Sequence, residues 1–408
     1  MKIIHLNGAD ITGGAARAAY RIHHSLLNSG LHSRMWVNNA KSGDWTVIGP
    51  KGKLNKAFAK IRSHAVFPIL KTMQTQNHII HSPAILRSSR SRLINQSDVD
   101  IAHLHWIGSE MLSIADIGRI KKPTVWTLHD MWGFCGAEHV SWDQRWREGY
   151  TRKNRPSSEK GFDINRWTWN RKINHWKRPF NIVAPSQWLA ECARDSYIMR
   201  DWPVTVIPNC LDTEIWQPVD KNFARKLIGL PIDVPLIGFG SYGANSEYHK
   251  GFDLLKQALN HLNGLSENLE LVVFGQPSPK KQPKLSFPVN FMGHLYDDLS
   301  LRLLYSAVDI LVVPSRREAF GQTASEAQAC GTPVAAFKIG GLSDIVKHKH
   351  TGYLAEPFDT EDLAEGIKWI LSHSTSEGLG KAARERALQK FSYEVVSSQY
   401  QELYKRLL

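Results

Sequence analysis

The stretch MKIIHLNGADITGGAARAAYRIHHSLL, residues 1–27, contains the pattern that decides the fold. It opens with a short apolar run typical of a buried strand, and a turn containing Gly13 and Gly14 follows. Over residues 15–27 apolar side chains recur at helical spacing, and a second strand-like run lies at 33–38. The order strand, glycine turn, helix, strand predicts the start of a βαβ unit.

The same alternation continues along the chain and restarts after residue 210. The first part has further strand-like runs at 101–105, 124–128 and 181–185. The second part has strands at 236–240, 269–274, 289–292, 310–314 and 333–337, and helices at 251–262, 299–307, 323–329, 360–373 and 393–407. This pattern predicts an α/β fold with two doubly wound domains, at 1–210 and 211–390, and a C-terminal helix over 391–408.

Composition excludes several classes of protein. With 408 residues, 42% of them hydrophobic, the chain has enough apolar material for sizeable cores, yet it has no apolar run of membrane-spanning length. Its N-terminus reads as a strand rather than a signal peptide. The four cysteines, Cys135, Cys192, Cys210 and Cys330, have no metal-binding spacing, so we expect neither a zinc site nor a disulfide framework and a cytoplasmic location.

Positive charge is confined to the N-terminal half. Residues 1–210 carry 30 Lys/Arg against 15 Asp/Glu, whereas residues 211–408 carry 21 against 23. No acidic residue occurs between Asp44 and Asp98. Such a surface attracts a phosphate-rich partner, which would be nucleic acid, anionic lipid or a pyrophosphate-bearing substrate; an ordinary solvated surface is the alternative.

Two segments of this half interrupt the alternation. Within the basic segment 51–92, residues 51–66 fit an amphipathic helix that either docks on a membrane or packs on its own domain. Segment 141–179 interleaves five tryptophans with Arg and Lys. Those rings either stack on bases or sugars, or form a small core of their own.

Three motifs indicate a site for an anionic, hydroxyl-rich ligand. The Gly13-Gly14 turn and the corresponding turn at Gly240 let the backbone approach a phosphate. Lys250, at the start of the next helix, can reach a diphosphate there and neutralise its charge. The most specific motif is PSRREAFGQTASE at 314–326, in which carboxylates at the loop and in the helix can accept hydrogen bonds from sugar hydroxyls.

This segment resembles the E-x7-E signature of retaining, nucleotide-sugar-dependent glycosyltransferases of family 4. That family has the GT-B architecture, in which two Rossmann-like domains face each other across a cleft and a C-terminal helix crosses back to the first domain. The resemblance extends over nearly the whole chain, through WTLHDMW (126–132), IPNCLD (207–212), IGGLSDIV (339–346) and FSY (391–393). Around His129 the chain is similar to colanic-acid, capsule and exopolysaccharide transferases.

The resemblance implies a role for each matching residue. Glu318 would bind hydroxyls of the transferred sugar, Lys250 would stabilise the leaving diphosphate, and His129 would lie beside the reacting sugar; these three are the expected catalytic residues. Glu326 would bind the ribose of the donor. The other implied donor-binding residues are Gly13, Gly14, Gly240, Ser241, Gly293, Leu295, Phe320, Gly321, Gln322 and Thr323. No metal and no cofactor is expected, and Asp297 is read as a helix N-cap.

Two departures limit what the resemblance implies. Ala244 stands where the family has an arginine, so the positive clamp on the diphosphate is weaker or comes from Arg17, Arg316 or Arg317. After His129 the cysteine-rich segment of relatives is reduced to Cys135, so acceptor specificity is not implied.

We therefore expect a hexosyltransferase-type, retaining, metal-independent enzyme of cell-surface polysaccharide biosynthesis. It would transfer a sugar from a nucleoside diphosphate sugar to a saccharide acceptor. The basic half fits an acceptor linked to polyprenyl pyrophosphate, with the protein peripheral on the anionic inner face of the cytoplasmic membrane. Two alternatives stay open: a nucleotide-sugar epimerase or phosphorylase of the same fold, and a nucleic-acid-binding protein that uses segments 51–92 and 141–179.

Overall fold

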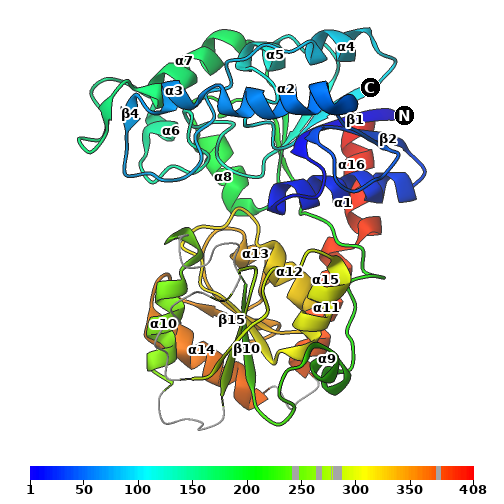
Figure 1. Cartoon of the computed structure of the whole chain (residues 1–408), viewed down its shortest axis with the longest axis vertical. Helices are drawn as coiled ribbons and strands as arrows, with labels where there is room; N and C mark the ends of the chain where they lie inside the picture. Colours follow the sequence, from blue (N-terminus) through cyan, green and yellow to red (C-terminus); the bar gives the residue numbers. More distant parts are fainter. Residues whose placement is uncertain (241–247, 263–268, 277, 279–286, 374–377) are drawn as a thin grey trace. The chain divides into compact units, whose positions relative to one another are not determined.

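The computed structural model describes residues 1–240, 248–262, 269–276, 278, 287–373 and 378–408. The chain divides into two compact units: unit 1 is Met1–Cys210 with Val396–Leu408, and unit 2 is Leu211–Val395. Each unit is a parallel sheet flanked by helices (Figure 1). The predicted fold class, two doubly wound α/β domains, is confirmed.

Unit 1 contains a seven-stranded parallel sheet of order β3-β2-β1-β5-β6-β8-β9. Its strands are β1 Lys2–Ala9, β2 His32–Asn39, β3 Val47–Ile48, β5 Ile101–Leu104, β6 Thr124–Thr127, β8 Asn181–Ala184 and β9 Val204–Val206. The strand order reverses beside β1, because β2 pairs with one of its edges and β5 with the other.

Helices cover the sheet of unit 1. They are α1 Gly14–Asn28, α2 Gly52–His64, α3 Phe67–Leu70, α4 Arg90–Gln96, α5 Ile114–Gly118, α6 Arg145–Glu148, α7 Ile164–His175 and α8 Gln187–Asp195. In α1 the apolar stripe anticipated from the sequence is buried, with Ala18, Ile22 and Leu26 fully inaccessible to solvent. A small antiparallel ribbon joins β4 Met73–Gln74 to β7 Lys160–Gly161.

The last helix, α16 Tyr393–Lys405, completes unit 1, to which its residues from Val396 onward belong. Tyr400 and Tyr404 are fully buried against the sheet. The hydroxyl of Tyr400 lies 2.9 Å from Oγ1 of Thr127, and that of Tyr404 lies 2.6 Å from Nδ1 of His103. The predicted C-terminal helix that returns to the first domain is therefore present.

Unit 2 contains a six-stranded parallel sheet of order β12-β11-β10-β13-β14-β15. Its strands are β10 Leu236–Gly240, β11 Glu270–Phe274, β12 Val289–Phe291, β13 Ile310–Val313, β14 Val334–Phe337 and β15 Gly352–Ala355. Its helices are α9 Lys221–Ile228, α10 Phe252–Asn260, α11 Asp298–Ala307, α12 Gln322–Ala329, α13 Leu342–Ile345, α14 Thr360–His373 and α15 Gly378–Phe391, with the 3-10 turn η1 Tyr248–Lys250. Apolar cores lie on both sides of the sheet, and the strand order reverses between β10 and β13.

The tryptophan-rich segment forms part of the interior of unit 1. Trp146, Trp169 and Trp176 are all less than a tenth exposed, although Trp142 is 43% exposed. The ammonium of buried Lys172 donates to the carbonyl oxygens of Cys135 and Gly136, at 3.0 and 2.8 Å. The interpretation as a small internal core is therefore supported for these three rings.

Within the residues described, we find no helix both long and apolar enough to cross a membrane.

Candidate functional site

In each unit the candidate site lies at the carboxyl ends of the strands where the strand order reverses, the usual position for ligands in doubly wound sheets. In unit 1 this position is a cavity of about 1340 Å³. Residues at or just beyond the ends of β1, β2 and β5 line it, together with the Gly13-Gly14 turn and the inner side of α2.

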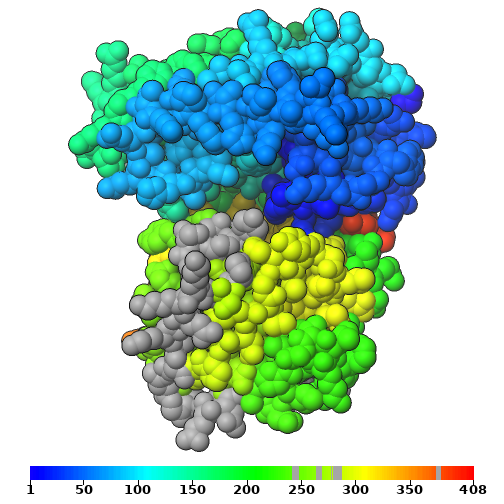
Figure 2. All heavy atoms as spheres, in the orientation of Figure 1, coloured from blue at the N-terminus to red at the C-terminus, as the bar shows by residue number. Residues whose placement is uncertain are grey.

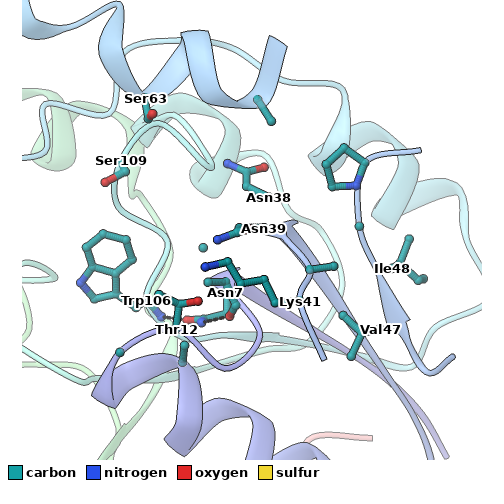
Figure 3. Close-up of a pocket in the computed structure, with 18 of the residues that line it drawn as sticks. Asn7, Thr12, Asn38, Asn39, Lys41, Val47, Ile48, Ser63, Trp106 and Ser109 are labelled. Atoms are coloured by element: carbon teal, nitrogen blue, oxygen red, sulfur yellow. Dashed lines mark hydrogen bonds between the residues drawn. The ribbon is translucent and has the colours of Figure 1, made fainter. Parts of the chain in front are cut away.

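Polar side chains occupy the middle of this cavity (Figure 3). The amides of Asn7, Asn38 and Asn39 lie between the indole of Trp106 on one side and Ile48 on the other. Hydroxyl groups of the lining come from Thr12, Ser63 and Ser109. Amides, hydroxyls and an indole plane are the groups that bind sugars, so the cavity suits a polyhydroxylated ligand.

Buried hydrogen bonds fix the cavity's floor. The carboxylate of Asp10, itself buried, accepts from the backbone N–H groups of Ile11, Lys41 and Ser42 at 2.7–2.8 Å. Oδ1 of Asn7 accepts from the backbone N–H of Trp106 at 2.8 Å. The turn after β1, the loop after β2 and the end of β5 are therefore connected to one another.

The cavity lining is basic. It includes five cationic side chains and no acidic one: Arg34, Lys41, Lys51, Lys56 and Lys60. Three of them come from α2 or the residue before it, which places Lys56 and Lys60 of this helix toward the cavity.

The apolar side of α2 faces solvent. No residue of α2 is buried, and Leu54, Phe58 and Ile61 are 86, 61 and 63% exposed. The helix lies along the surface of unit 1 as the blue segment in the space-filling view (Figure 2). The interpretation of 51–66 as a helix that packs its apolar side on its own domain is therefore wrong.

His129 follows β6 and is half-buried. Its Nε2 is 3.1 Å from Nδ1 of His105, and burial lowers the pKa of His129 to about 4. The next residue, Asp130, accepts a hydrogen bond from His139 at 2.6 Å. Burial acts to raise the pKa of the Asp130 carboxyl, but His139 and smaller contributions from other neighbours outweigh it, and the pKa is lowered. His129 is therefore neutral at pH 7 and sits near Trp106, since both line one small hollow beside the cavity.

In unit 2 the predicted residues Lys250 and Glu318 meet. Nζ of Lys250 lies 2.9 Å from Oε2 of Glu318, with 29 and 18% of the two side chains exposed. Lys250 comes from η1 beyond β10, and Glu318 comes from the loop after β13. The two strands are neighbours at the reversal of strand order, which is why residues 68 positions apart come together.

Glycines allow neighbouring loops to approach the loop after β13. Gly251 has a φ of +72°, and a Cβ there would lie 1.9 Å from the carbonyl oxygen of Pro314. Gly340 has a φ of +49°, and a Cβ there would lie 2.2 Å from the carbonyl oxygen of Glu318. Only glycine fits both positions.

Helix α12 begins beside this pair. Gly321 is its N-cap with a φ of +107°, and Gln322 and Thr323 form its first turn, so the positive end of the helix dipole lies at this point. Phe320 is 3% exposed and packs on Phe391, which leaves its backbone rather than its ring for a ligand. The start of α12 thus lies beside the Lys250–Glu318 pair.

Glu326 lies inside α12 and is buried. It is only 4% exposed, and its Oε2 accepts from the hydroxyl of Tyr305 at 2.9 Å. The sequence signalled no role for Tyr305, whose position depends on the packing of α11 against α12.

The remaining predicted residues are spread over both units. Gly13, Gly14 and His129 belong to unit 1, and the donor-binding residues from Gly240 onward belong to unit 2. Gly293 lies beside β11, where its carbonyl accepts from Gly275, and Leu295 packs on the core. Ser241 and Ala244 lie outside the described residues.

Arg316 does not supply the missing positive clamp. Its guanidinium makes two bonds to the carboxylate of Asp253, at 2.7 and 2.6 Å, and lies 3.9 Å from the ring centre of Tyr248. As expected, Asp297 caps α11 by accepting from the backbone N–H of Ser300.

Sequence reasoning missed the polar lining of the unit 1 cavity and the histidines behind His129. Asn7, Asn38 and Asn39 each stand at the end of a strand, a position that could have marked them. His103 in β5 and His105 just after it are two residues apart, the spacing of one side of a strand, which was the available signal.

Comparison with known families gives a consistent result for the two units. A family model described as Glycosyltransferase Family 4 matches residues 12–215, which is half of the chain. A second model, described as Glycosyl transferases group 1, matches residues 241–386.

Curated relatives match about half of the chain. A D-inositol 3-phosphate glycosyltransferase of Stackebrandtia nassauensis is 35% identical over 211 residues, 47% of this chain and 46% of the relative. A lipopolysaccharide 1,2-N-acetylglucosaminetransferase of Salmonella typhimurium is 27% identical over 55% of this chain and 61% of its own. The chain spans about half the length of most curated relatives it matches.

Solved structures match along the whole length. Sucrose-phosphate synthase of Thermosynechococcus elongatus has a TM-score of 0.68 at 20% identity, covering 100% of this chain and 99% of its own. HepE of Anabaena, solved in complex with UDP-glucose, has a TM-score of 0.65 at 17% identity and covers both chains fully. At such identities the likeness concerns the fold, which is GT-B.

Proposed function

The chain belongs to glycosyltransferase family 4, and from that premise we propose that it transfers a sugar from a nucleoside diphosphate sugar to a saccharide acceptor, with retention of configuration and without a metal ion. The observation that carries this proposal is the Lys250–Glu318 pair beside the first turn of α12. A cation, a carboxylate and the N-terminus of a helix are groups that can hold a diphosphate and a sugar together.

Different residues of unit 2 bind different parts of the donor. Lys250 and the N–H groups of α12 stabilise the negative charge that grows on the leaving diphosphate. Glu318 accepts hydrogen bonds from hydroxyls of the transferred sugar. Glu326 binds the ribose, and Tyr305 holds that carboxylate in place.

The acceptor binds in the cavity of unit 1. Its amides and Trp106 suit the sugar, and its five cations suit a phosphate or pyrophosphate attached to that sugar. The Gly13-Gly14 turn lines the same cavity, and the indole of Trp106 connects it with the hollow beside His129.

A lipid-linked acceptor would also explain α2. This helix turns Lys56 and Lys60 toward the cavity and Leu54, Phe58 and Ile61 toward solvent. An anionic membrane surface is the partner that matches exposed apolar side chains next to lysines. We infer a peripheral enzyme of cell-surface polysaccharide synthesis on the inner face of the cytoplasmic membrane.

The donor proposal is tested by thermal unfolding with UDP-, GDP-, ADP- and CMP-linked sugars. One donor is expected to raise the melting temperature of the wild type, since a ligand at 100 times its Kd adds about 2.7 kcal/mol. Glu318→Gln and Lys250→Met should reduce the rise, and Lys256→Met, on the exposed side of α10, should not. No rise with any donor, in the presence or absence of saccharide lipids, would contradict the proposal.

Retention and metal independence need their own readouts. Proton NMR of the product should show the anomeric configuration of the donor, and activity should persist in EDTA. We propose that the acceptor attacks directly, on the face from which the diphosphate leaves, so a sugar trapped covalently on Glu318 would contradict this and show a two-step reaction.

A further inference from the structure

Three histidine rings of unit 1 form a hydrogen-bonded row that ends at His129. Nδ1 of His5 lies 2.9 Å from Nε2 of His105, and Nδ1 of His105 lies 3.1 Å from Nε2 of His129. Neighbouring rings are nearly parallel, with an angle of 23° in both pairs. His5 and His105 are buried, so water does not compete for these bonds.

The row restricts where the ring protons can be. A neutral imidazole has one N–H and one lone pair, so each ring that donates at one nitrogen must accept at the other. Turning the ring of His105 over would put carbon atoms where both nitrogens are, and both bonds would be lost. Either all three rings carry their proton on Nδ1, or all three carry it on Nε2.

The inner end of the row distinguishes these two arrangements. Nε2 of His5 is buried and has no hydrogen-bond partner among the described residues. With all protons on Nε2, this atom would be a buried N–H without an acceptor, a rare and costly defect in protein interiors. With all protons on Nδ1 it is an unprotonated nitrogen, which favours the Nδ1–H arrangement.

The rings are also uncharged at neutral pH. Burial and the neighbouring histidines hold the pKa values of His5 and His105 well below the usual range, and burial lowers that of His129 to about 4. A proton added to His129 would therefore not be retained in this row.

We propose that His5 and His105 are positioning residues that hold His129 as the neutral Nδ1–H tautomer. His129 then presents a hydrogen-bond donor at its outer nitrogen, for which the described residues offer no acceptor. In the reaction, a part of the inference that rests on the proposed function, this N–H donates to an oxygen of the reacting sugar. His129 would accordingly not act as a general base.

A metal site is the competing interpretation of the same side chains. Ring nitrogens of His5, His103 and His105 all lie within 4.8 Å of one another. However, both nitrogens of His103 are engaged, with Tyr404 and Thr127, and both of His105 are engaged in the row. An ion would have to displace these hydrogen bonds, so the structure favours the row.

Nuclear magnetic resonance of the full chain, labelled with ¹⁵N in its histidine rings, tests the tautomer directly. Long-range proton–nitrogen correlations identify which nitrogen of each ring carries the proton, and single substitutions assign the signals. We expect Nδ1–H for His5, His105 and His129 at pH 7.5. An Nε2–H signal for His129, or different tautomers within the row, would overturn the proposal whatever the enzyme's activity.

Two variants of His105 test the dependence of His129 on the row. His105→Asn keeps an N–H near the position of Nδ1 and should preserve the tautomer of His129, whereas His105→Leu should leave its two forms in exchange. His103→Leu, a matched change in the same buried layer but outside the row, should leave the His129 signals unchanged. If His105→Leu does not fold, the tautomers of the wild type and of His105→Asn still test the proposal.

Turnover gives a second readout. His105→Leu should lower kcat about tenfold with little change in donor KM, since about one hydrogen bond to the transition state is lost. His105→Asn should restore most of the loss. An equal loss of kcat in both variants would contradict the proposed role of the row. A shift of the His5, His103 and His105 signals on adding one equivalent of Zn²⁺ would favour the metal site instead.

Discussion

The two units use charge differently around their candidate sites. In unit 2 the cations are paired with carboxylates: Lys250 with Glu318, and Arg316 with Asp253. In unit 1 the cavity lysines Lys51, Lys56 and Lys60 form no ion pair with any described residue. Unit 2 therefore holds its charges in fixed positions, whereas unit 1 leaves positive charge available to a partner.

The largest expected difference between the units is in their response to acid. Burial lowers the pKa of His23 to about 3 and that of His129 to about 4, and those of His5, His103 and His105 well below 6.5. Between pH 6.5 and these values the unfolded chain binds protons that unit 1 does not. Stability present above pH 6.5 is therefore lost as the pH falls, by about 1.4 kcal/mol per pH unit for each histidine.

Urea unfolding at pH 7.5 and pH 5.0, followed by tryptophan fluorescence, measures this effect, because 12 of the 14 tryptophans lie in residues 1–210. Hydrogen exchange by mass spectrometry follows unit 2 in the same samples. An equal loss of stability in both units at pH 5.0 would show that the two units do not differ in their response to acid.

The next effect concerns the glycines at each site. Gly251→Ala should destabilise unit 2 by more than about 3 kcal/mol, because its Cβ meets the backbone of Pro314 at 1.9 Å. Gly13→Ala should cost about 1 kcal/mol, because its φ of +92° is unfavourable but nothing lies within 4 Å of the added Cβ. Equal losses in urea unfolding would show that the two turns are equally constrained.

Turnover should separate the paired cation of unit 2 from an ordinary lysine. Lys250→Met is expected to lower kcat about 100-fold, because charge on the leaving diphosphate loses its stabilising partner. Lys256→Met serves as the control with the same change of charge. Similar kcat values for the two variants would remove Lys250 from the reaction.

The smallest effect should come from one unpaired lysine of unit 1. Lys56→Gln is expected to weaken binding to anionic vesicles about fivefold, in line with about 1 kcal/mol per basic residue near such a surface. Lys153→Gln, also exposed on unit 1, is the control. If flotation at low salt shows the same vesicle binding for both variants and the wild type, the lysines of the cavity do not contribute to membrane binding.

The local sequence pattern predicted the architecture. It did not predict the contacts that depend on tertiary packing. The strand at 236–240 and the helix at 360–373 were predicted with their observed bounds, because each has a strong period and clear ends. Lys250 and Glu318 were each singled out by a motif, but only the pairing of β10 with β13 brings them into contact. The pairing of Arg316 with Asp253 and the outward side of α2 depend on neighbours far along the chain, and no local signal reports them.

The histidine row shows the same limit. His5 and His105 are 100 residues apart, and only the pairing of β1 with β5 brings them together. The spacing of His103 and His105 is that of residues on one side of a strand, but it does not show that they lie behind His129. The sequence therefore identified the group at the end of the row and not the groups that orient it.

Helix α16 has a consequence for the order in which the protein can be completed during synthesis. Unit 1 starts with β1 at Lys2, yet the hydroxyl of Thr127 and Nδ1 of His103 each have a hydrogen-bond partner in α16, Tyr400 and Tyr404. Those tyrosines are translated after all of unit 2, which is one continuous stretch and can close its core earlier. Unit 1, most of which is translated before unit 2, therefore has two polar groups of its sheet uncovered until α16 has been synthesised.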